Sequence, residues 1–117
     1  MRLKFVSTFA VWTLAFAQTA WADNDQIALG RARATEFCSA CHQVTKDQPP
    51  PAPVPYPEEN ADVVTPSFLA ISMKYQGHEA ELRSFIKAPA HPMKEQEFLK
   101  QDLDAIVAYI GSARTRW

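Results

Sequence analysis

The stretch Cys38-Ser39-Ala40-Cys41-His42 decides how the rest of this chain folds. Its two thiols, three positions apart, lie on nearly one side of a helical turn, so both can form thioether bonds to the two vinyl groups of a single haem. His42 then lies beneath the iron, where imidazole is a common ligand. The C-x-x-C-H order therefore predicts one covalently attached haem c, held by Cys38 and Cys41, with His42 as an axial iron ligand.

Three other interpretations of the cysteine pair compete with haem attachment. A thioredoxin-like redox dithiol needs a preceding strand and a βαβ pattern, and the sequence shows neither. A zinc site would have only three ligands, because no second cysteine pair is present to complete a tetrahedron. A disulfide between cysteines three positions apart would close a loop too small to stabilise the fold much.

Residues 1–22 have the features of a secretory signal peptide. A short basic start precedes an uncharged, mostly apolar run over residues 5–17, which is shorter than the roughly 20 apolar residues that cross a bilayer. Ala20-Trp21-Ala22 supplies small residues for cleavage, which predicts a mature domain of residues 23–117 in the periplasm, without a stable membrane span. An uncleaved membrane anchor is the alternative. Export fits the haem prediction, because bacteria attach c-type haem outside the cytoplasm.

Loss of the signal makes the chain more acidic. The 117 residues carry a formal net charge of −1. Arg2 and Lys4 leave with the signal and no acidic residue does, so the mature domain carries −3. Nucleic acids bind basic surfaces, and this composition argues against them as partners. A domain of this size also has a marginal core, which an apolar, covalently attached haem would stabilise.

The periodicity of the mature domain is helical, and no window alternates like a strand. A helix is expected over 24–38, interrupted by Gly30, where a glycine suggests close approach of another element. Thr65 and Pro66 fit the cap and the first position of a short helix. Two more helices are expected over 79–87 and about 100–113. The apolar residues expected on the buried faces are, in chain order, Phe68, Leu69, Met73, Leu82, Phe85, Ile86, Leu103, Ile106, Val107 and Ile110.

A proline-rich insertion, residues 48–64, separates the haem motif from the later helices. Six of the nine residues 49–57 are proline, which favours extended polyproline II and excludes a helix or a central strand. The insertion is predicted to be a semi-rigid strap over one haem edge. A docking site for a partner is the alternative.

The second axial ligand has four candidates in the mature domain: Met73, His78, His91 and Met93. Met73 has helical spacing typical of a core residue, and His78 follows a glycine at a helix start, where a surface position or a cap is expected. Met93 follows Pro92 in a loop between helices, so its side chain has no helical face to fill. Thioether sulfur is an axial ligand that raises the potential. Met93 is therefore the predicted ligand, with His91 as its competitor.

The pattern resembles the class I c-type cytochromes, which are small single-haem electron carriers. The resemblance spans nearly the whole mature domain, through the haem motif, Thr65-Pro66-Ser67-Phe68-Leu69, His91-Pro92-Met93 and the terminal helix. It implies an all-α, cytochrome c-like fold of about four helices around one haem. It also implies that the carbonyl of Pro66 accepts a hydrogen bond from His42, and that the first and last helices cross at Gly30, against Ile106 and Tyr109.

These features predict a periplasmic one-electron carrier rather than an enzyme, with redox proteins as partners. The apolar residues expected to line the haem pocket are Phe68, Leu82, Phe85, Phe98 and Ile106. A ring of lysines around the haem edge is expected to steer an acidic partner, and its members are Lys74, Lys87, Lys94 and Lys100. The alternatives are a dedicated haem subunit of a periplasmic dehydrogenase, docked through the insertion, a haem-based ligand sensor, and a thiol redox protein without haem.

Overall fold

The computed structural model describes residues 12–90 and 92–117. The elements follow in the order α1 (Trp12–Phe37), β1 (Val54–Tyr56), the 3-10 helix η1 (Pro57–Glu59), β2 (Ala61–Val63), α2 (Phe68–Lys74), α3 (Glu79–Lys87) and α4 (Lys100–Arg116). Residues 1–11 of the predicted signal peptide lie outside the described residues, and α1 runs on through the predicted cleavage position. Cleavage after residue 22 stays a prediction.

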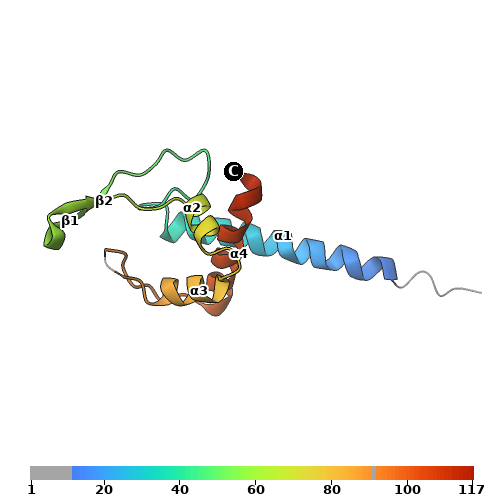
Figure 1. Cartoon of the computed structure of the whole chain (residues 1–117). Coiled ribbons are helices and arrows are strands. Elements are labelled where there is room, and N and C mark those ends of the chain that lie inside the picture. Colours follow the sequence, from blue (N-terminus) through green and yellow to red (C-terminus); the bar gives the residue numbers. More distant parts are fainter. Residues whose placement is uncertain (1–11, 91) are drawn as a thin grey trace, which may run out of the picture.

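The crossing of α1 and α4 is the centre of the fold (Figure 1). Gly30 lies there because nothing larger fits: a Cβ atom on Gly30 would lie 2.0 Å from the carbonyl oxygen of Ala105 and 2.7 Å from Cβ of Tyr109. The expected close approach at Gly30 is confirmed, with Tyr109 as one partner. The nearest atoms of α4 otherwise belong to Ala105 rather than to Ile106.

The hydrophobic core gathers around α4, whose apolar stripe faces the other three helices. The four stripe residues predicted from the sequence are all buried: Leu103, Ile106, Val107 and Ile110. The cluster is completed by Ala34 from α1, Val44 from the loop after the haem motif, Phe68 from α2, Leu82 and Ile86 from α3, and Tyr109 from α4. Phe85 was expected beside them but stays 39% exposed. The fold is thus an all-α domain whose single core depends on its C-terminal helix.

The short helix α2 begins later than predicted. Ser67, not Thr65, is its N-cap, and the Ser67 side chain accepts a hydrogen bond from the backbone nitrogen of Ala70 at 3.2 Å. The prediction that Met73 is buried is also wrong, because Met73 is 64% exposed. At about 100° per residue, Met73 lies some 140° around the helix from Phe68, whereas Ser72 lies close to it and is buried.

A β-hairpin occupies the proline-rich insertion, where no strand was predicted. β1 and β2 pair antiparallel, with Val54 opposite Val63 and Tyr56 opposite Ala61. Asn60, with φ 52°, closes the turn in the left-handed conformation that asparagine tolerates. Both strands of a two-stranded ribbon are edge strands. An edge strand accepts prolines, whereas a central strand does not. Figure 1 shows the hairpin projecting away from the helices.

No helix among the described residues is long and apolar enough to cross a membrane.

Candidate functional site

The haem motif forms one extra turn at the end of α1. The backbone nitrogen of Cys38 donates to Ala34 at 2.9 Å, and that of His42 donates to Cys38 at 2.9 Å. The two cysteines and His42 are therefore presented by a single helix-like turn that follows directly from α1. The two cysteines form no disulfide with each other, and Cys38 is half-buried whereas Cys41 is exposed.

Burial raises the pKa of the Cys38 thiol to about 11, with a smaller contribution from the neighbouring Cys41. The thiol is consequently neutral at physiological pH. A raised pKa argues against an activated redox thiolate, which needs a lowered one.

The imidazole of His42 is oriented by Pro66. Its Nδ1 lies 2.7 Å from the carbonyl oxygen of Pro66. Because a carbonyl can only accept, Nδ1 carries the proton and Nε2 keeps its lone pair. This is the hydrogen bond that the resemblance implied, and it joins residues 24 positions apart. It leaves Nε2 in the form that ligates a metal, although ligation itself stays a prediction.

The donor set fits a c-type haem and does not fit a metal ion bound by the protein alone. The turn offers two thiols for thioether bonds and one imidazole nitrogen for iron. In the part of the chain that the structure describes, no group of three or more His, Cys, Asp or Glu side chains is placed to hold a metal ion. The zinc alternative therefore has no support in the described residues.

Met93 lies in the connection between α3 and α4, outside any helix. It is half-buried, and its backbone nitrogen donates to Ala90 at 3.2 Å, which makes a tight turn. His91 lies outside the described residues. His78 is exposed, and its Nδ1 lies 3.0 Å from Glu81, as expected for a surface residue. The sixth ligand stays a prediction.

The predicted haem pocket is only partly a continuous apolar surface. Phe68, Leu82 and Ile106 are buried, Phe98 is half-buried against the core, and Phe85 is largely exposed. Of the four lysines predicted to ring the haem edge, Lys100 bonds Asp104 and Lys74 lies over the ring of Tyr75. Lys87 and Lys94 are exposed.

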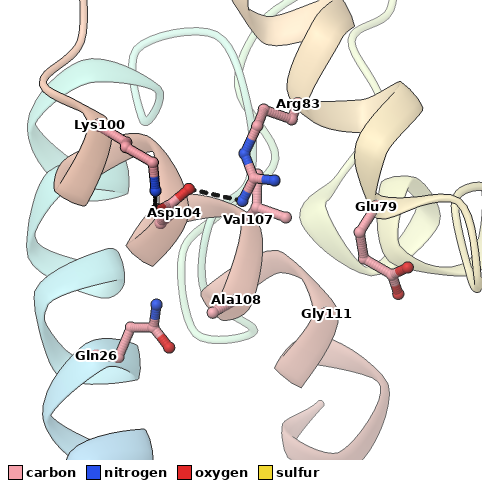
Figure 2. A pocket seen from close by; sticks show the side chains of 8 residues that line it. All are labelled: Gln26, Glu79, Arg83, Lys100, Asp104, Val107, Ala108 and Gly111. Carbon is pink, nitrogen blue, oxygen red and sulfur yellow. Dashed lines mark hydrogen bonds and ion pairs between the residues drawn. The ribbon is translucent and has the colours of Figure 1, made fainter.

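An open groove of about 530 Å³ lies between α1, α3 and α4, away from the haem motif (Figure 2). Arg83 and Lys100 each approach Asp104 at 2.7 Å. The hydrogen bond from Lys100, with the positive charges of Lys100 and Arg83, lowers the pKa of Asp104. The three charges satisfy one another, so the groove is a junction between α3 and α4 rather than a reactive site.

Two residues bond the haem motif in a way that the sequence did not predict: Gln48 was not singled out, and Thr65 was predicted only as a helix cap. Thr65 donates its hydroxyl to the carbonyl of Cys41, and Gln48 donates its amide to the carbonyls of Ser39 and His42. Local pattern offers no signal for either bond, because Gln48 lies six and nine positions from its partners and Thr65 lies 24 positions from Cys41, at the far end of the insertion.

Comparison with known proteins agrees with the geometry. The family model described as "Cytochrome c" matches residues 27–114, which include the haem motif, the insertion and most of the C-terminal helix. No curated protein and no solved structure matches the chain. The chain belongs to the cytochrome c family, whose members carry electrons on a covalently attached haem c.

Proposed function

We propose that this protein is an exported, periplasmic one-electron carrier in which His42 and Met93 ligate the iron of one haem c. The observation that carries the proposal is the 2.7 Å contact from Nδ1 of His42 to Pro66. It selects the tautomer and the ring orientation that an axial ligand needs. His42 directly follows Cys41, whose thiol is a predicted attachment point of the haem.

The bound haem supplies a centre that gains and loses one electron. The chain's own residues do the rest. Cys38 and Cys41 tether the group, and His42 is held on one side by Pro66. Met93, as a thioether ligand, would favour the reduced form and raise the potential. If His42 and Met93 both ligated the iron, no substrate would reach it, which is why we propose electron transfer rather than catalysis.

Two other candidates for the sixth iron ligand, Met73 and His78, lie at exposed positions on or beside helices. Met73 is exposed on α2, on a different side of that helix from the buried Phe68. His78 is exposed and bonded to Glu81. Met93 alone among these three is half-buried in an irregular segment, where a side chain can point away from a helical core.

Ligation is tested on holoprotein exported from a host that attaches c-type haem. The wild type should show low-spin reduced bands, a weak long-wavelength methionine-to-iron charge-transfer band when oxidised, and indifference to carbon monoxide. Met93→Ala should lose that band, bind carbon monoxide and have a lower potential. Met73→Ala is the matched control and should keep all three properties. The ligand assignment is wrong if His91→Ala, and not Met93→Ala, opens the sixth position.

A second candidate function, the stable haem subunit of a larger redox enzyme, is favoured by the hairpin. Its strands pack on each other and β2 packs on η1, while Figure 1 shows the hairpin extending away from the helices. Glu58, Glu59 and Asp62 are exposed on it, as is Val64 beside it, at 79%. Residues 47–73 contain no Lys, Arg or His. An acidic arm of this kind suits a partner with a basic surface.

Removal of the hairpin distinguishes the two functions. Replacing residues 54–63 by a short Gly-Ser linker should leave the haem spectrum unchanged, because the hairpin projects away from the helices. A dedicated subunit would copurify with its partner in fixed stoichiometry, and the shortened protein would not. A mobile carrier would purify alone in both forms. The triple variant Asp62→Asn, Glu58→Gln, Glu59→Gln separates charge from shape, since it keeps the hairpin and removes three negative charges.

A further inference from the structure

The carbonyl groups of the haem motif are nearly all hydrogen-bonded, although the turn lies beyond the end of α1. The carbonyl of Cys38 accepts from the backbone nitrogens of Cys41 and His42. The two carbonyls that follow the motif accept hydrogen bonds from distant residues. The carbonyl of Gln43 accepts from the backbone nitrogen of Phe68, and that of Val44 accepts from the hydroxyl of Tyr109. Helix ends leave such carbonyls without partners unless other groups supply donors. The bonds therefore show that the turn is clamped from outside.

Gln48 makes three of these external bonds with one side chain. Its Nε2 donates to the carbonyls of Ser39 and His42, each at 3.0 Å. Its Oε1 accepts from the backbone nitrogen of Val44 at 3.0 Å. The partners decide the orientation of the amide, because two carbonyls need a donor and one N–H needs an acceptor.

Gln48 is itself held in place. Its backbone nitrogen donates to Thr45 at 3.2 Å, and its carbonyl accepts from the side chain of Gln43 at 2.8 Å. The side chain is therefore anchored at its base while its amide bonds the turn. Its three bonds are partly shielded from water, where a lost partner costs more than it does at the surface.

We propose that Gln48 is a positioning residue for the axial histidine. It fixes the backbone of His42 through that residue's carbonyl, while Pro66 fixes the ring through Nδ1. Because Gln48 is the first residue of the proline-rich insertion and Pro66 follows its end, His42 is held from both ends of the insertion. The inference rests on the proposed role of His42 as an iron ligand and assigns Gln48 a part in setting the potential.

The direction of the effect follows from electrostatics. The amide N–H groups of Gln48 offset the negative ends of two carbonyl dipoles beside His42. Without those donors, the two oxygens favour the more positive, oxidised state of the bound group. Loss of Gln48 should therefore lower the reduction potential as well as loosen the turn.

The test compares holoprotein carrying Gln48→Leu with wild type and with Gln76→Ala, an exposed glutamine beyond α2. Leucine keeps much of the volume and removes all three bonds. Relative to wild type, hydrogen exchange at the Val44 amide should become about tenfold faster, while exchange at the Ile106 amide should stay unchanged. The effect is local because only one partly buried bond is lost there. The equilibrium constant for reduction should fall at least about threefold, or roughly 28 mV at 59 mV per tenfold.

Both changes are required, and Gln76→Ala should show neither. An unchanged potential overturns the proposal, as does uniformly faster exchange at Val44 and Ile106, which would mean a general loss of stability. If Gln48→Leu does not fold, Gln48→Asn keeps the amide but is one methylene short, and the same pair of results is required of it. Failure of the proposed ligation would appear separately, in the wild-type spectrum, because the exchange comparison does not depend on the sixth ligand.

Discussion

Gly30 is where one added methyl group should do most harm to this fold. A Cβ atom at that position would lie 2.0 Å from the carbonyl oxygen of Ala105 and 2.6 Å from its carbon, against 3.4 Å for an ordinary contact. Both atoms belong to the backbone of α4, so no side-chain rotation can relieve the contact. In Gly30→Ala, α1 and α4 must therefore separate along the crossing that organises the core.

The expected cost of Gly30→Ala combines three effects. Overpacking costs about 3 kcal/mol at the upper end of its usual range, which applies because backbone must move. The buried hydrogen bond from the Tyr109 hydroxyl to the Val44 carbonyl is weakened when α4 moves, which costs about 1 kcal/mol. Alanine regains about 1 kcal/mol of helix propensity. The net loss in free energy of unfolding is about 3 kcal/mol.

Urea unfolding of the holoprotein, followed by far-ultraviolet circular dichroism, measures this loss. Gly111→Ala is the matched control: the glycine lies within α4, and a Cβ there would meet nothing within 4 Å. The control should gain about 1 kcal/mol from helix propensity alone. If Gly30→Ala is as stable as wild type, the crossing does not have the close approach on which the argument depends.

Two further changes test individual bonds in the fold. Tyr109→Phe leaves the buried carbonyl of Val44 without its donor at 2.7 Å, and the free energy of unfolding should fall by about 1–3 kcal/mol; a loss too small to measure in urea would contradict this. Asp104→Asn should lower the urea midpoint at pH 7, because Lys100 and Arg83 stabilise the carboxylate and lower its pKa. A lowered pKa contributes stability above the unfolded value, so the difference from wild type should shrink as pH falls below about 4; a constant difference would contradict it.

The predictions that succeeded depend on local periodicity. α3 has the predicted bounds, 79–87, and α4 begins at the predicted Lys100, ending at Arg116, three residues beyond the expected end. Their buried stripes follow from one apolar face repeating every three or four residues, a signal that each helix carries within itself. The glycine at the α1–α4 crossing was also recognisable, since a helix keeps such a residue at a cost.

The predictions that failed concern segments whose structure depends on what surrounds them. The local pattern favours Thr65 as a helix cap, yet its hydroxyl bonds the carbonyl of Cys41, and Ser67 caps α2 instead. Composition excluded a central strand in the insertion, but a two-stranded hairpin with two edges accepts prolines that a larger sheet would reject. In both cases the local pattern allowed more than one outcome.

The sequence by itself determined the chemistry of this protein: a C-x-x-C-H turn that attaches haem c, and apolar stripes that build helices around it. These are properties of residues close together in the chain. Only the tertiary structure decided that Gln48 and Thr65 hold the carbonyls of the haem turn and that Ala105 meets Gly30. The physical reason is that a hydrogen bond or a backbone contact between distant residues depends on distances of a few tenths of an ångström, which packing sets and local pattern does not.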